Sequence, residues 1–367
     1  MGLGWVDDAA LVLGTELSVA QVLSEGVRTV VARCWVDGST TATDGARTVV
    51  AKCFRSKAMA HNSGGFGIVR EVCGLGTIPG APHLYAADLD LGVVVMEDVA
   101  GVPLASLLSG ADAEATLSAG AQWGLATARV MASSVDAVPS FREAVRRADP
   151  DSRSAGGPAS PQLPRRGLER LCRALEIEVP DDAMVELAAV DLLNGGEDAV
   201  VTQADPCPGN VLIGSRGARF VDFEATSVHH PAIDVVNLLM PWSTCDGMVG
   251  VPAEFLDAVR DGFIGGHPRA AGWLAADSMI GLAGTAAALQ LTELSLEPLR
   301  RRGDVAGRAR MVHRWRWARA HADLTDTIGS LCGRMVDLAV DGWGWPSRPD
   351  LAPCFTNHGS PPRGRNT

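Results

Sequence analysis

The most informative part of the sequence reads Thr202-Gln203-Ala204-Asp205-Pro206-Cys207-Pro208-Gly209-Asn210-Val211-Leu212-Ile213, and Arg219-Phe220-Val221-Asp222-Phe223-Glu224 follows it. Asp205 and Asn210 lie on a loop that opens a predicted hairpin, and Asp222 ends its second strand. The hairpin should therefore bring Asn210 and Asp222 together. Phosphoryl transfer needs one carboxylate that takes the proton of the acceptor hydroxyl, and an amide and a second carboxylate that hold Mg²⁺ against the triphosphate. The pattern predicts such a site, with ATP and Mg²⁺ as cofactors.

These motifs resemble the aminoglycoside phosphotransferase and choline kinase-like family, whose members are relatives of the protein kinases. The resemblance extends over about residues 17–340. It implies an α+β, bilobal protein kinase-like fold with a five-stranded N-lobe and a mainly helical C-lobe. It also implies that Asp205 is the catalytic base and that Asn210 and Asp222 are the magnesium ligands. Asp234 matches the family's buried aspartate, which braces the catalytic loop from the following helix.

The first hundred residues agree with this expectation independently. Their β-branched runs predict five strands and one helix after the third strand, at 18–23, 27–36, 48–54, 84–88 and 93–99 for the strands and 66–75 for the helix. Within the third run, Lys52 ends the β-branched segment Thr48-Val49-Val50-Ala51-Lys52, where the family has the lysine that contacts the α- and β-phosphates. Glu71 lies in the predicted helix, where its carboxylate could pair with Lys52. Only Lys52 and Lys57 are lysines in this arginine-rich chain, and the planar guanidinium of arginine does not replace a compact ammonium.

The run over residues 93–101 resembles the interlobe hinge of the same family. If it is the hinge, the backbone C=O of Glu97 and the N–H of Val99 bind the adenine edge of the nucleotide. Met96 would line the back of that pocket.

We expect residues 1–100 to form a nucleotide-binding lobe and residues 101–345 to form a helical lobe that carries the catalytic loop, 202–224. Residues 346–367, rich in Pro, Gly, Arg and Asn, are expected to be a disordered tail. The segment 139–167 is rich in Pro, Ser, Gly and Arg, and we expect an exposed or mobile loop there.

Composition restricts the possible partners and location. The 367 residues carry a net charge of −11, which argues against a nucleic-acid partner. No stretch approaches 18 uninterrupted apolar residues, so we expect no membrane span and a cytoplasmic protein. The eight cysteines form no CxxC pair or ligand cluster, and we interpret them as reduced thiols rather than zinc ligands. No pattern in the sequence specifies an oligomeric state.

Two functions remain open at this stage. The first is an ATP-dependent phosphotransferase that acts on a hydroxyl of a small molecule, such as an aminoglycoside, a nucleoside antibiotic or an amino alcohol. The second is a nucleotide-binding pseudokinase with a regulatory role. It is suggested by Gln203, which stands where the family usually has histidine, and by the turn between the first two strands, where only Gly26 is glycine. The lack of an Ala-Pro-Glu motif and of an activation-segment phosphosite argues against a protein kinase.

Overall fold

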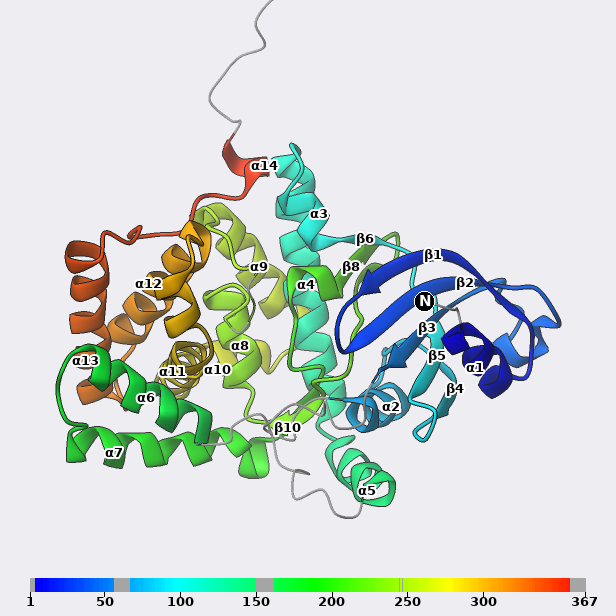
Figure 1. Ribbon diagram of the computed structural model, residues 1–367, viewed down its shortest axis with the longest axis horizontal. Helices are drawn as coiled ribbons and strands as arrows, with labels where there is room; N and C mark the ends of the chain where they lie inside the picture. The colour runs from blue at the N-terminus through cyan, green and yellow to red at the C-terminus, as the bar shows by residue number, and fades with distance from the viewer. Residues whose placement is uncertain (1–3, 56–66, 150–161, 244, 246, 357–367) are drawn as a thin grey trace, which may run out of the picture.

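The computed structural model describes residues 4–55, 67–149, 162–243, 245 and 247–356. Two lobes lie next to each other, a β-sheet lobe from the N-terminal part of the chain and a larger helical lobe (Figure 1). This is the predicted α+β, bilobal kinase-like fold. The division of the chain at residue 100 stays a prediction.

The N-lobe is built on a five-stranded antiparallel sheet with the order β1-β2-β3-β5-β4. Its elements are α1 (Gly4–Leu13), β1 (Leu17–Glu25), β2 (Thr29–Val36), η1 (Thr40–Thr43), β3 (Thr48–Phe54), α2 (Ile68–Thr77), β4 (Leu84–Asp88) and β5 (Val93–Glu97). Because side chains alternate along a strand, β5 buries Val95 against α1 and the neighbouring Val94 and Met96 in the larger core that includes α2. The sheet is therefore covered on both faces, and α1, which the sequence analysis did not predict, covers one of them.

The second lobe begins with β6 (Val102–Pro103) and contains most of the helices. Its helices are α3 (Leu104–Leu108), α4 (Ala113–Ser134), α5 (Val138–Ala148), α6 (Gln162–Ala174), α7 (Asp181–Ala188), α8 (Ala232–Leu239), α9 (Ala253–Gly266), α10 (Ala270–Leu274), α11 (Asp277–Arg301), α12 (Val305–Ala320), α13 (Asp326–Asp337) and α14 (Pro353–Thr356). Shorter turns of helix are η3 (Ala189–Asn194), η4 (Gly196–Asp198), η5 (Pro208–Asn210) and η6 (Leu338–Gly342). Four short strands complete it: β7 (Val200–Thr202), β8 (Val211–Gly214), β9 (Gly217–Phe220) and β10 (Ser227–His229).

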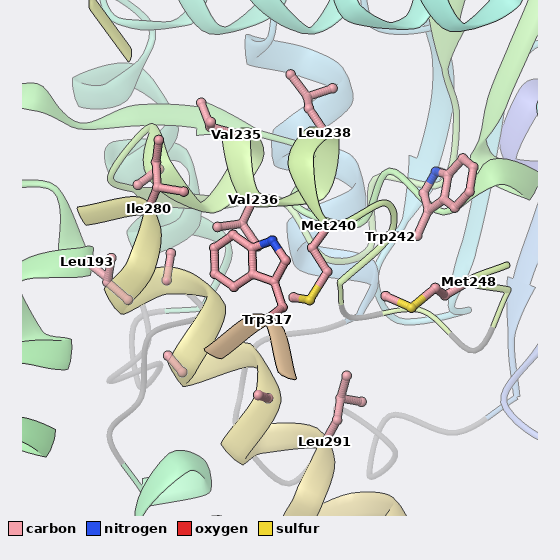
Figure 2. Packing of buried hydrophobic residues seen from close by; sticks show 14 of the residues in the cluster. Leu193, Val235, Val236, Leu238, Met240, Trp242, Met248, Ile280, Leu291 and Trp317 are labelled. Atoms are coloured by element: carbon pink, nitrogen blue, oxygen red, sulfur yellow. The ribbon is translucent and has the colours of Figure 1, made fainter. Parts of the chain in front are cut away.

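Part of the core of this lobe lies among α8, α11 and α12. Val236 of α8, Met240 directly after α8 and Trp317 of α12 belong to one continuous buried cluster, part of which is drawn in Figure 2. A Cβ on Gly284 of α11 would lie 1.9 Å from the ring of Trp317, so only glycine allows this ring to pack on the helix. Such close packing fixes α11 against α12, and α11 in turn contacts α8, the helix that carries Asp234.

Helix α11 also explains an apolar segment of the sequence. Among the described residues, it is the one helix with the length and hydropathy of a membrane span, and 72% of its apolar window is buried inside the protein. Its composition is therefore that of a central core helix of the lobe.

Two sequence expectations need correction here. The first is the loop expected over 139–167: α5 occupies its beginning and α6 its end, and 150–161 lie outside the described residues. Pro139 stands at the start of α5, where a missing N–H costs nothing. Phe141 and Val145, one turn apart, are both buried in the core, and their burial stabilises a helix that the polar composition concealed.

The second correction concerns the expected disordered tail. Residues 346–356 are packed on the lobe, whereas 357–367 lie outside the described residues. The N–H of Gly250 donates to the carbonyl of Asp350, and the N–H of Ala352 donates back to the carbonyl of Gly250, both at 2.8 Å. Ala352 and Cys354 are buried. Backbone pairing and these small apolar side chains hold a segment whose composition alone predicted disorder.

Candidate active site

The hairpin formed by β8 and β9 carries the predicted catalytic loop. Val211 pairs with Phe220, and one step further the N–H of Val221 donates to the carbonyl of Asn210 at 2.9 Å. Asn210 and Asp222 therefore lie at the same open end of the hairpin, as the spacing predicted. The side-chain Nδ2 of Asn210 donates to the carbonyl of Asp205 at 3.1 Å, which fixes the loop between these two residues and leaves Oδ1 of Asn210 as the available ligand atom.

Lys52 joins the two lobes at this end of the hairpin. Its Nζ lies 2.7 Å from Oε2 of Glu71 on α2, contacts Oδ1 of Asp222, and lies 3.1 Å from Oε2 of Glu224. Lys52 and Glu71 are both buried. The sequence predicted that Lys52, Glu71 and Asp222 converge, and the structure confirms it across 170 positions of the chain.

The carboxylates around Lys52 favour its charged form. Burial by itself lowers the pKa of Lys52, but the carboxylates of Glu71, Asp222 and Glu224 outweigh it and raise that pKa above its ordinary value. Burial raises the pKa of Glu71 to about 7, against the opposing effect of Lys52. The ammonium therefore stays charged at neutral pH, as a ligand for phosphate oxygens requires.

Asp205 follows Ala204, whose φ of 59° is in the left-handed region, so the backbone turns sharply before the carboxylate. Burial raises the pKa of Asp205 to about 7, and the negative charges of Asp222 and Glu224 add to the rise. Arg28 and Lys52 oppose it. A carboxylate with a pKa near neutrality suits proton transfer at physiological pH.

This pKa predicts the pH dependence of turnover. As the predicted base, Asp205 must be deprotonated to accept a proton, so kcat/KM for the acceptor should rise with pH and level off above about 7. Steady-state rates across this range measure it. The residual activity of Asp205→Asn should no longer show an inflection in this pH profile, whereas the activity of Glu71→Gln should still show it. The two variants therefore distinguish Asp205 from Glu71, whose pKa is also about 7. An inflection that persists in Asp205→Asn would contradict the assignment.

Hydrogen bonds that involve Thr202 of β7 and Asp234 of α8 hold the predicted catalytic loop in place. The hydroxyl of Thr202 donates to Oδ1 of Asp234 at 3.0 Å and accepts from the N–H of Ala204 at 3.2 Å. Asp234 also lies 3.0 Å from Nε2 of His229, so the bracing contact expected from the family is present. Nε2 of Gln203 donates to the carbonyl of Val221. Gln203, which stands where the family usually has histidine, thus ties the loop to the residue before Asp222.

A disulfide joins Cys207, inside the catalytic loop, to Cys245, with 5.8 Å between their Cα atoms. The expectation of eight reduced thiols is wrong for this pair, because the chain after α8 returns against the catalytic loop. The other six cysteines are free thiols: Cys34, Cys53, Cys73, Cys172, Cys332 and Cys354.

Reduction of this bond should destabilise the protein. The disulfide closes a loop of 38 positions, for which loop entropy gives about 4 kcal/mol. A reductant should therefore lower the Tm of the wild type by a few degrees, with no effect on the double variant Cys207→Ser/Cys245→Ser. Differential scanning calorimetry with and without dithiothreitol tests this. A reductant shift of equal size in the double variant would show that another thiol is responsible.

The predicted hinge residues end β5. Both carboxylate oxygens of Glu97 are bonded by Arg219 of β9, and its Oε2 accepts from the N–H of His83 at 3.1 Å. The hydrogen bond with Arg219 lowers the pKa of Glu97. Within the described part of the chain, the N–H of Val99 donates to no backbone carbonyl. Binding of adenine by Glu97 and Val99 stays a prediction.

Sequence analysis missed two charged residues of this site. Glu224 follows Asp222-Phe223, and its carboxylate oxygens lie close to those of Glu71 and Asp222, within 4.8 Å of one another. Nη2 of Arg28, from the turn between β1 and β2, lies 2.9 Å from Oε1 of Glu224. The position of Glu224 directly after the motif was a signal that could have been used, whereas nothing in the local sequence distinguishes Arg28 from other surface arginines.

The fold and the site define a kinase-like phosphotransferase. The chain matches the phosphotransferase enzyme family over residues 43–273, more than half of its length, and belongs to that family. A search of curated proteins finds no match.

Solved structures of similar proteins include a candidate fructosamine-3-kinase from Thermobifida fusca, at 20% identity and TM-score 0.47, covering 90% of this chain and 98% of that one. A macrolide 2′-phosphotransferase from Brachybacterium faecium has 16% identity and TM-score 0.44, covering 86% and 97%. A choline/ethanolamine kinase family protein from Mesorhizobium loti has 15% identity and TM-score 0.43, covering 90% and 99%.

Proposed function

We propose that this small-molecule kinase moves the γ-phosphate of ATP to a hydroxyl of a small molecule, with Asp205 as the base. One observation carries the proposal: Lys52 from the sheet lobe, paired with buried Glu71, contacts Asp222 at the open end of the catalytic hairpin. A buried ammonium held among carboxylates, next to a loop that carries Asp205 and Asn210, fits the needs of phosphoryl transfer.

The donor set suits Mg²⁺, which prefers hard oxygen ligands. Oδ1 of Asn210 and the carboxylate of Asp222 would hold the ion, and the nearby carboxylate of Glu224 provides further negative charge. When bound, the ion would neutralise charge on the transferring phosphoryl group. Lys52 would bind the α- and β-phosphate oxygens, and Glu97 and Val99 would bind adenine.

Asp205 would orient the acceptor hydroxyl and take its proton as the hydroxyl oxygen bonds to the γ-phosphorus. The bond between that phosphorus and the bridging oxygen to the β-phosphate then breaks, and ADP leaves. The bond from Asn210 to the carbonyl of Asp205 would keep the base and the metal site in a fixed relation, which is the main protein contribution to such a reaction.

We infer an antibiotic or an amino alcohol as the acceptor, from the resemblance of the motifs to the aminoglycoside phosphotransferase and choline kinase-like family. The pseudokinase alternative is less well supported, because Gln203 binds the carbonyl of Val221 and so connects the loop of Asp205 with the strand end that carries Asp222.

A transfer assay tests the proposal. The purified protein with Mg²⁺ and ATP should add one HPO₃ unit, detected by mass spectrometry, to a member of a panel of aminoglycosides, macrolides, nucleoside antibiotics and amino alcohols. EDTA and the variant Asp222→Asn should each abolish the product. Nucleotide binding without hydrolysis or transfer to any member would instead favour the pseudokinase.

A further inference from the structure

The turn between β1 and β2 carries a positive charge into the candidate active site. Nη2 of Arg28 lies 2.9 Å from Oε1 of Glu224. The backbone of the turn is fixed on both sides: the N–H of Gly26 donates to the carbonyl of Thr29 at 2.9 Å, and the N–H of Arg55 donates to the carbonyl of Arg28 at 2.8 Å. The guanidinium therefore extends from an ordered turn.

Arg28 and Lys52, the proposed phosphate-binding lysine, contact the same carboxylate, that of Glu224. Oε2 of Glu224 is 3.1 Å from Nζ of Lys52, while Oε1 of the same carboxylate binds Arg28. Arg28 also opposes the rise in the pKa of Asp205, together with Lys52. Its positive charge therefore acts on Asp205, the proposed base, and on Glu224, which lies close to the proposed metal ligand Asp222. The terminal phosphate of a nucleotide would be transferred between these groups.

The turn is poor in the groups that usually hold phosphate. A glycine-rich turn presents backbone N–H groups to phosphate oxygens, but here Gly26 is the one glycine in the turn and its N–H is already bonded. A guanidinium offers an alternative, because its planar fork matches phosphate oxygens and binds them in pairs.

The bond to Glu224 is suited to exchange. The side chain of Arg28 is 39% exposed, whereas that of Glu224 is 9% exposed. An ion pair with one exposed partner contributes little stability, so a phosphate with more charge can displace the carboxylate. Release of Arg28 leaves Glu224 paired with Lys52 through Oε2 among the described residues, and frees its Oε1 close to the proposed magnesium ligand Asp222.

We propose that Arg28 binds the γ-phosphate of the nucleotide, exchanging Glu224 for phosphate oxygens when ATP binds. This inference rests on the proposed function and adds to it a residue that distinguishes ATP from ADP. Lys52 binds the inner phosphates, and Arg28 supplies from the turn the positive charge at the outer one.

Calorimetric titration with Mg²⁺ and either AMP-PNP or ADP tests the inference on the full chain. Arg28→Gln should weaken AMP-PNP binding by about 10- to 100-fold, the loss of charge-assisted hydrogen bonds. Its ADP affinity should change by less than about threefold. Arg28→Lys should fall between the wild type and Arg28→Gln, because it keeps the charge without the fork.

Arg55→Gln is the matched control. Arg55 pairs with Glu25 at the base of the same turn, at 2.5 Å, with 33% of its side chain exposed, so its loss tests whether any charge change at the turn has the same effect. It should bind both nucleotides as the wild type does. An equal loss of both nucleotides in Arg28→Gln would indicate a structural role and overturn the inference, as would unchanged AMP-PNP binding. A wild type that binds neither nucleotide would overturn the proposed function itself.

Discussion

Asp205→Asn should lower kcat by about 1,000-fold, the loss expected when a positioned base is removed. The amide has the shape of the carboxylate but cannot accept the proton of the acceptor hydroxyl. Because Lys52 and Asp222 stay in place, the affinity for Mg²⁺-nucleotide should change by less than about threefold. A coupled assay for ADP release, with calorimetry for nucleotide binding, measures both quantities. Asp205→Ala should show a loss of the same order.

Asp198→Asn is the matched control for this variant. Asp198 is an exposed aspartate seven positions earlier in the chain, in η4, and the exchange removes the same charge. It should leave kcat and nucleotide affinity unchanged. If Asp205→Asn turned over at nearly the wild-type rate, the base assignment would be wrong.

Lys52→Met should reduce both turnover and stability. Loss of the ammonium removes the proposed phosphate ligand and leaves the buried carboxylate of Glu71 without its partner at 2.7 Å. Breaking a buried ion pair in this way destabilises a protein by about 3 kcal/mol or more. Because Glu71 would then have a folded-state pKa raised further above its unfolded value, the loss of stability should grow as the pH rises through that folded-state pKa. Chemical denaturation at two pH values measures it.

The double variant Lys52→Met/Glu71→Gln separates the two effects. Replacing the orphaned carboxylate by a neutral amide should recover most of the lost unfolding free energy, because no unpaired charge remains buried. Turnover should stay about 100-fold or more below the wild type, since the phosphate ligand is still missing. Recovery of activity together with stability would mean that Lys52 has only a structural role.

Part of the site could be read directly from the sequence. The loop from Asp205 to Asn210 and the hairpin that follows are local features, and the pairing of Val211 with Phe220 follows from a short turn between two strands. Lys52 could be placed because it ends a β-branched run in a chain with almost no other lysine. These inferences succeeded since each depends on neighbours within a few positions, or on a family pattern that already encodes the distant contacts.

Other parts failed for identifiable reasons. Helix α1 has Val6, Ala9 and Leu13 buried at helical spacing, a signal that was present but short. Helix α5 was concealed by the Pro, Ser and Arg residues on its exposed side. The packing of 346–356 depends on Gly250, a hundred positions earlier, and no local pattern of the tail reports that backbone pairing.

The sequence by itself determined the five strands of the N-lobe with the helix after the third, the catalytic hairpin, and the residue types that phosphoryl transfer requires, because strand alternation, helical spacing and short turns are local properties of a chain. Only the tertiary structure decided that Cys207 bonds Cys245 and that Arg28 reaches Glu224. Both contacts join segments that are distant in the sequence. Arg28 and Glu224 in addition come from opposite lobes, so the contact between them depends on how the two lobes pack against each other.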